Sequence, residues 1–319
     1  MARPRVFVDG HVGTTGLRIR EWLADREDLE LLEIEASARK DAAERRSLAN
    51  AADLVVLCLP DDAAREAVAW IENPATRVVD ASTAHRIAPG WAYGLPELSP
   101  AQRRAVAGSR RVSNPGCYAI TLILGLRPLV DAKILPGDAP ITIHALSGYT
   151  GGGRSLIERW EDPERALLRL PFEAPYALDR VHKHVPEMAK YAGLAREPQF
   201  VPAVGPFATG MRVEIPLHAS LLAPGASAKA IWELLATRYA DEPFVRVAPF
   251  EESLGQDERR YDPLACNGTN RIELHVAPNP AGHVLLVGLL DNLGKGAAGS
   301  AIQNLNLMLG RPETTGLRR

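Results

Sequence analysis

The sequence has few cysteines, no long apolar run and almost no net charge. Its three cysteines lie far apart and are odd in number, which fits a reducing compartment better than a disulfide framework. No stretch of about 18 apolar residues is present, so we expect no membrane-spanning helix. The start of the chain has too few apolar side chains for a secretion signal. These shortages together predict a soluble protein of the cytoplasm.

The net charge of −2 leaves no basic excess to bind a nucleic-acid backbone or an anionic membrane, so we expect neither as a partner. What the chain does have is an ordinary globular composition, with 46% hydrophobic residues in a length of 319. At about 150 residues per domain, this length predicts two domains.

The first third of the chain alternates short apolar runs with helical patterns. We expect strands at 5–9, 29–34, 53–60 and 77–81, and helices at 16–24 and 62–71. Alternation of this kind predicts a parallel, doubly wound sheet. Residues 1–115 are therefore interpreted as an α/β Rossmann dinucleotide-binding domain.

The pattern changes after residue 115, where the expected elements become longer. They are strands at 141–146, 211–222, 271–276 and 284–290, and helices at 118–129 and 228–239. The Pro-rich stretch 160–210 is expected to be irregular. We interpret residues 116–295 as an α+β domain with a mixed sheet. A last helix, 296–309, carries an apolar stripe that suits either domain.

A glycine-rich turn separates the first expected strand from the first expected helix. Its glycines permit a tight turn and let the backbone approach a pyrophosphate closely. The backbone N–H groups at the start of the helix would then face the negative charge of the pyrophosphate. Because the spacing departs from the common Gly-x-Gly-x-x-Gly, a turn without a ligand is the alternative. The residues expected to bind the cofactor are Gly10, Gly13, Thr14, Thr15 and Gly16.

The residues after the second strand would face the adenosine ribose of a bound dinucleotide. Glu35 suits the 2′-hydroxyl of NAD, whereas Ser37, Arg39 and Lys40 suit the 2′-phosphate of NADP. Three cationic or hydroxyl groups favour NADP. The alternative is that these side chains belong to a solvated loop.

Cys117 stands where the first expected domain ends and a helix begins, directly after Pro115 and Gly116. A thiol at a helix N-terminus has a lowered pKa and becomes a better nucleophile. The alternative is a small buried side chain, the common fate of a free cysteine. Cys58, inside an apolar run, is expected to be such a core residue.

Two histidines and a carboxylate, His182, His184 and Glu187, lie within six residues of one another. A thiolate nucleophile needs a nearby acid/base with a pKa near neutrality, and histidine is the usual choice. Metal ligation and a polar loop are the alternatives. No further cluster of such residues stands close in sequence to complete a metal site, so no metal is expected.

A second glycine-rich segment, 147–155, follows an expected strand and ends at a cation and a helix start. Such a segment suits a phosphate or a carboxylate. A surface ion pair is the alternative for each arginine. The residues expected to bind an anionic substrate are Ser147, Arg154, Arg86 and Arg212.

Several segments give the chain a specific resemblance. It resembles the short bacterial form of the N-acetyl-gamma-glutamyl-phosphate reductases, in the aspartate-semialdehyde dehydrogenase-like superfamily. The matching segments are GHVGTTGL at 10–17, DASTAHR at 80–86, GLPEL at 94–98, SNPGCY at 113–118, SGYTGGGR at 147–154, HKHVPE at 182–187 and DNLGKGAAGSAIQNLNL at 291–307. The chain departs from many relatives at Ala119, where proline is common.

The resemblance implies an NADPH-dependent reduction of N-acetyl-L-glutamyl 5-phosphate to the 5-semialdehyde, with release of phosphate, in L-arginine biosynthesis. It implies that Cys117 forms a thioester, with His182 or His184 as acid/base and Glu187 as their orienting partner. It places Ser82 and Asn292 near the NADP cofactor. It also implies that the C-terminal helix, 296–319, completes the Rossmann domain, and that the chain forms a homodimer or homotetramer.

Three other functions remain open on the sequence. Aspartate-semialdehyde dehydrogenase shares the cysteine and the histidine, although its motif around the histidine differs from HKHVPE. A non-catalytic NADP-binding regulator would not need Cys117. A histidine-based metallohydrolase would contain a metal after purification.

Overall fold

The computed structural model describes residues 3–319 and divides into two compact units. The first holds the described residues up to Pro115 together with Ala297–Arg318, and the second holds Gly116–Gly296 and Arg319. Within the described part of the chain, no helix has the length and apolar character needed to cross a membrane.

The first unit is built on a six-stranded sheet whose paired strands all run parallel. This confirms the expected doubly wound α/β class. The strand order is β2 (Glu30–Leu32), β1 (Arg5–Asp9), β3 (Leu54–Leu57), β4 (Arg77–Asp80), β6 (Arg111–Ser113) and β5 (Ala92–Tyr93).

Helices cover both faces of this sheet, and two separate apolar clusters fill the two interfaces. The first cluster joins α1 (Thr14–Leu23) and α9 (Gly299–Met308) to one face. The second joins α2 (Ala42–Ala51) and α3 (Asp61–Ala69) to the other face. Burial on both faces explains why Leu54–Leu57 is apolar without interruption. Near α9 lies α4 (Pro100–Gly108), whose Val106 belongs to the first cluster.

The second unit contains a seven-stranded mixed sheet, which confirms the expected class of this half. Two neighbouring pairs are parallel, and the others are antiparallel. The strand order is β11 (Val245–Val247), β12 (Ile272–Pro278), β13 (Val284–Leu290), β10 (Met211–Leu217), β7 (Thr142–Gly148), β9 (Gln199–Gly205) and β8 (Ala174–Pro175).

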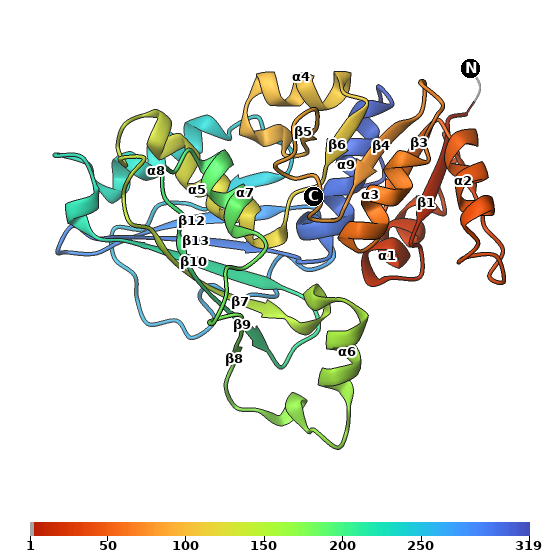
Figure 1. Cartoon of the computed structure of the whole chain (residues 1–319). Helices are drawn as coiled ribbons and strands as arrows, with labels where there is room; N and C mark the ends of the chain where they lie inside the picture. Colours follow the sequence, from red (N-terminus) through yellow and green to blue (C-terminus); the bar gives the residue numbers. More distant parts are fainter. Residues whose placement is uncertain (1–2) are drawn as a thin grey trace. The chain divides into compact units, whose positions relative to one another are not determined.

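Three helices cover one face of the mixed sheet, namely α5 (Cys117–Asp131), α7 (Val185–Ala192) and α8 (Ala228–Arg238) (Figure 1). Ile215 of β10 is fully buried and its side chain reaches Gly125 of α5. Gly288 of β13 lets Thr121 of α5 approach closely, because a Cβ there would collide with the threonine side chain. Close packing of this kind holds α5 rigidly on the sheet.

Two expectations about the second unit were wrong. The stretch 160–210 is not irregular, because it contains the end of α6 (Arg154–Glu161) together with β8, α7 and β9. The strand expected over 211–222 ends at Leu217. There the Nδ1 atom of His218 accepts a hydrogen bond from the backbone N–H of Ser220 and starts a turn.

Candidate functional site

The glycine turn of the first unit has the geometry of an anion site. Gly10 has a φ of +86°, and a Cβ at either Gly10 or Gly16 would collide with a backbone carbonyl. The helix α1 begins at Thr14 after Gly13. Among the described residues, no side chain caps this helix start and no acidic side chain lies in its first turn. The turn therefore fits the pyrophosphate of a dinucleotide.

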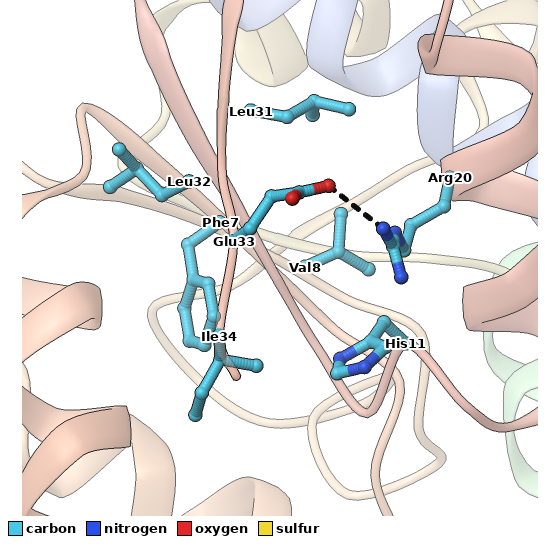
Figure 2. Close-up of a pocket in the computed structure, with 8 residues that line it drawn as sticks. All are labelled: Phe7, Val8, His11, Arg20, Leu31, Leu32, Glu33 and Ile34. Carbon is cyan, nitrogen blue, oxygen red and sulfur yellow. Dashed lines mark hydrogen bonds and ion pairs between the residues drawn. The ribbon is translucent and has the colours of Figure 1, made fainter. Parts of the chain in front are cut away.

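A pocket lies beside this turn (Figure 2). Its wall is apolar and its rim is polar. Arg20 reaches from α1 to Glu33, and its guanidinium donates a hydrogen bond of 2.9 Å to the carboxylate. Burial, followed by the charge of Arg20, lowers the pKa of the neighbouring His11. The apolar wall is formed by Phe7, Val8, Leu31, Leu32 and Ile34.

The three residues expected to hold a 2′-phosphate lie on the exposed turn between β2 and α2. Ser37, Arg39 and Lys40 all have exposed side chains there, and Glu35 is exposed as well. The charge of Arg39 is one of the smaller causes of the lowered pKa of His11, which lines the pocket.

The loop after β4 holds Ser82, His85 and Arg86 through buried hydrogen bonds. The hydroxyl of Ser82 donates to Asp80 at 2.8 Å, and Nδ1 of His85 lies 2.6 Å from the same carboxylate. The Nε atom of Arg86 donates to the carbonyl of Asn114 at 2.9 Å. Arg86 is only 7% exposed. It thus holds the backbone that leads to Cys117.

Two buried asparagines, not expected from the sequence, fix the same segment. The Nδ2 atom of Asn304, on α9, donates to Oδ1 of Asn114 at 3.0 Å and to the carbonyl of Gly94 at 3.0 Å. Asn114 in turn donates to the carbonyl of Ala297 at 2.9 Å. Both asparagines lie inside segments that carry the family resemblance. Their spacing, however, gives no sign that they meet.

Cys117 is the first residue of α5, with Gly116 as the preceding cap residue. Cys117 and Cys58 are both half-buried, and Cys266 is buried. Burial raises the pKa of the thiols of Cys58 and Cys266, and neither of these residues begins a helix. Gly296 leaves space beside the nucleophile position, since a Cβ there would lie 2.8 Å from the Cβ of Cys117. Of the three thiols, this one has the setting of a nucleophile.

The structure brings the histidine segment to the first turn of α5. Oε2 of Glu187 accepts a hydrogen bond of 3.1 Å from the backbone N–H of Gly116. His184 precedes α7 and, like Glu187, is buried. The Nδ1 atom of His182 accepts a hydrogen bond of 3.1 Å from the backbone N–H of His184.

Two tyrosines join this cluster, and sequence reasoning missed both. The hydroxyl groups of Tyr118 and Tyr176 lie 3.1 Å apart, and that of Tyr176 lies 3.3 Å from Nε2 of His182. Burial is the main reason that the pKa of Tyr118 is raised well above 10 and that of Tyr176 to about 12. The charge of Cys117 raises both pKa values further.

The remaining expected residues of the second unit separate into two groups. Ser147 and Asn292 are buried near the end of β7, where Nδ2 of Asn292 donates to Oγ1 of Thr150 at 3.3 Å. Arg154 is exposed and paired with Glu158 at 2.8 Å. Arg212 forms an ion pair of 3.0 Å with Glu214. Its strand neighbours Met211 and Val213 are buried on the side of the sheet that α5 covers, so the side chain of Arg212 lies on the opposite face.

No cluster of three or more His, Cys, Asp or Glu side chains within residues 3–319 is placed to hold a metal ion.

Comparisons with known proteins identify both halves of the chain. Residues 5–106 match the model "Semialdehyde dehydrogenase, NAD binding domain", and residues 117–292 match "Semialdehyde dehydrogenase, dimerisation domain". The aspartate semialdehyde dehydrogenase II of Vibrio cholerae, complexed with ASA, has a similar fold, with a TM-score of 0.71. The two chains are 14% identical, and the alignment covers 97% of this chain and 99% of the Vibrio cholerae chain.

Closer relatives bear a more specific name. N-acetyl-gamma-glutamyl-phosphate reductase 2 of Nostoc sp. is 49% identical over 323 residues, covering 99% of this chain and 100% of that protein. The N-acetyl-gamma-glutamyl-phosphate reductase of Burkholderia orbicola is 49% identical over 311 residues. These residues cover 97% of this chain and 98% of that protein.

The fold, the glycine turn and the cysteine at a helix start define a protein of the semialdehyde dehydrogenase class. Within that class, the chain belongs to the N-acetyl-gamma-glutamyl-phosphate reductase family, as its full-length relatives at 49% identity show.

Proposed function

We propose that the chain reduces N-acetyl-L-glutamyl 5-phosphate to N-acetyl-L-glutamate 5-semialdehyde with NADPH, releasing phosphate, in L-arginine biosynthesis. The observation that carries this proposal is Cys117 at the first position of α5, with Glu187 bound to the N–H of Gly116. The names of the full-length relatives support the choice of substrate.

The proposed nucleophile is the thiolate of Cys117. It attacks the acyl carbon of the substrate, the bond from that carbon to the phosphate oxygen breaks, and a thioester remains on the sulfur. The N–H groups of the first turn of α5 face the oxyanion that forms in this step. After reduction of the thioester, the thiohemiacetal on Cys117 releases the aldehyde and regenerates the thiolate.

The proposed acid/base is one of the two histidines, His182 or His184. Its task is to take the thiol proton and later to protonate or deprotonate the oxygen of the thiohemiacetal. Glu187 is buried three residues after His184, and its proposed task is to stabilise the positively charged imidazole. Its hydrogen bond to Gly116 fixes this carboxylate at the start of the cysteine helix.

The glycine turn is the proposed NADP site, and its residues fit the group. Gly10, Gly13 and Gly16 leave the backbone open to a pyrophosphate, and Thr14 and Thr15 add hydroxyl donors at the helix start. Ser37, Arg39 and Lys40 are proposed to bind the 2′-phosphate, with Ser82 and Asn292 nearer the nicotinamide. When bound, NADPH supplies the hydride that reduces the thioester.

The substrate's anionic groups are proposed to bind Ser147 and Arg86, with Arg154 and Arg212 as further candidates. Ser147 is buried on the sheet face that α5 covers, which favours it. Arg154 and Arg212 are engaged in ion pairs with Glu158 and Glu214, which an arriving anion would have to replace.

The match to a dimerisation domain supports a homodimer or homotetramer as the working form. We place the enzyme in the cytoplasm, where arginine precursors and NADPH are supplied and where free thiols stay reduced.

The test is the reverse reaction, followed by NADPH absorbance, with semialdehyde, NADP and phosphate. Cys117→Ser should lose nearly all turnover, while His182→Asn and His184→Asn should identify the acid/base by the larger loss of kcat. Wild-type turnover by Cys117→Ser would overturn the thioester route. Faster turnover of aspartate semialdehyde than of N-acetylglutamate semialdehyde would instead favour an aspartate-semialdehyde dehydrogenase.

A further inference from the structure

A chain of side-chain contacts runs from the end of β7 to the histidine segment. Tyr118 interacts with the hydroxyl of Ser147, and its own hydroxyl lies 3.1 Å from that of Tyr176. The next contact, from Tyr176 to Nε2 of His182, is 3.3 Å. The last, from the backbone N–H of His184 to Nδ1 of His182, is 3.1 Å.

The tautomer of His182 follows from its contacts. Because Nδ1 of His182 accepts from a backbone N–H, the proton of the neutral ring must be on Nε2. Nε2–H then donates to the hydroxyl of Tyr176. Tyr118 donates to Tyr176 as well, since this bond raises the pKa of Tyr118 and lowers that of Tyr176. The bond with Ser147 lowers the pKa of Tyr118, as a hydrogen bond donated to the phenol oxygen does.

Tyr176 is also fixed to the sheet. Its backbone N–H donates to the carbonyl of Pro202 on β9 at 3.0 Å. The ring of His182 packs edge-on against Phe200 of the same strand, with centroids 5.1 Å apart. The phenol is thus held at a defined position between α5 and the histidine segment.

The histidine segment is consequently connected to the start of α5 in two ways, one direct and one through Tyr176. One is the hydrogen bond between Glu187 and Gly116, and the other is the contact between Tyr176 and Tyr118, the residue next to the nucleophile. Two such bonds restrict how far the imidazoles can move from Cys117.

We propose that Tyr176 is a positioning residue, whose hydroxyl links Tyr118 to His182 and so sets the distance between the histidine pair and the Cys117 thiol. This inference rests on the proposed function for its catalytic meaning. The arrangement itself can be tested without turnover. The raised pKa of Tyr176 keeps its phenol protonated at neutral pH, as a link of this kind requires.

The titratable groups gathered around the first turn of α5 come from three elements or their flanks. They are Tyr118 of α5, Glu187 of α7 with His182 and His184 on the segment before it, and Tyr176 after β8. A shift of the histidine pair changes the charge environment of the thiol. The ionisation of Cys117 is therefore the direct readout of the arrangement.

The experiment measures the pH dependence of Cys117 alkylation by iodoacetamide in Tyr176→Phe and in wild type. The modified peptide is quantified by mass spectrometry, because Cys58 and Cys266 are also present. In Tyr176→Phe we expect the apparent pKa of Cys117 to move by about half a unit or more. We also expect kcat to fall about 3- to 10-fold, with KM for NADPH unchanged.

Tyr118→Phe breaks the same chain one step earlier and should shift the alkylation profile in the same direction. It also serves if Tyr176→Phe does not fold. The matched control is Tyr239→Phe, which removes a buried hydroxyl bonded to the carbonyl of Leu124 at 2.7 Å, farther along α5. This control should leave both the alkylation profile and kcat unchanged.

Wild-type alkylation profiles in both Tyr176→Phe and Tyr118→Phe would overturn the proposal. An equal shift in Tyr239→Phe would overturn it too, because general loosening of the unit would then be the cause. If wild-type enzyme reduces no acyl phosphate, the proposed function fails. The alkylation profiles still decide whether Tyr176 sets the environment of the thiol.

Discussion

The carboxylate of Glu187 and the backbone N–H of Gly116 form a buried hydrogen bond of 3.1 Å, across 71 residues of sequence. Gly116 immediately precedes Cys117, so an acidic side chain of α7 is tied directly to the start of the cysteine helix. Substitutions at Glu187 can separate the structural role of this bond from its electrostatic role.

Glu187→Gln keeps an acceptor for Gly116 but removes the negative charge. We expect kcat to fall by up to about 100-fold, because a charged imidazole loses its partner, with little change in stability.

Glu187→Ala should also lose about 1–3 kcal/mol of unfolding free energy, since the N–H of Gly116 is left buried without its acceptor. Turnover assays and urea unfolding measure both effects. Glu233→Gln on the exposed side of α8 is the control, and full activity in Glu187→Gln would contradict the electrostatic role.

Gly296→Ala tests the space beside the nucleophile. The added Cβ would lie 2.8 Å from the Cβ of Cys117, so one of the two segments must move. We expect a stability loss of about 1–3 kcal/mol and slower alkylation of Cys117. Gly255→Ala adds a methyl group with open space around it and should behave as wild type. Equal alkylation rates in the two variants would show that the site tolerates the methyl group.

The cofactor preference can be tested at the exposed turn after β2. Arg39→Ala or Lys40→Ala should raise KM for NADPH roughly tenfold, because a charge-assisted contact to the 2′-phosphate is lost. KM for NADH should stay the same. Arg65→Ala removes a similarly exposed arginine, on α3, paired with Asp62, and should change neither constant. Parallel rises in both KM values would argue against 2′-phosphate recognition by this turn.

The lowered pKa of His11 predicts a pH effect on stability. Burial and the charge of Arg20 disfavour the protonated ring in the folded chain, so the unfolded chain binds this proton more readily. Acidification below about pH 6.5 therefore favours unfolding. His11→Gln removes this contribution, so its Tm should fall less than that of wild type between about pH 8 and pH 5.5. The neighbouring charges of Asp9, Glu33 and Arg39 are common to both proteins, so they do not affect the comparison. Equal decreases in Tm would mean that the pKa of His11 is not lowered by folding.

The fold class could be predicted because its signals are local. The uninterrupted apolar run around Leu54–Leu57 indicates a strand buried on both faces, and the structure shows such a strand. The helix Ala42–Ala51 was not foreseen, because charged and small residues give it no clear apolar stripe. The strand Gln199–Gly205 was hidden by Pro202 and by the irregular pattern around it.

The candidate site was only partly accessible to sequence reasoning. Cys117 and the segment from His182 to Glu187 could be singled out, because residue type and neighbouring residues indicate their chemistry. Tyr176 could not, since a tyrosine in a loop carries no signal until the sheet places it between Tyr118 and His182. Arg86 has a charge that suggests a ligand, but the burial of its guanidinium against Asn114 depends on tertiary packing.

Asn304 makes the segment before Cys117 depend on a helix far along the chain. Its amide holds Gly94 and Asn114, which lie 210 and 190 residues earlier in the sequence. A fragment that lacks α9 would carry Cys117 but not this support. The segment before Cys117 should therefore reach its final conformation only after α9 has been synthesised.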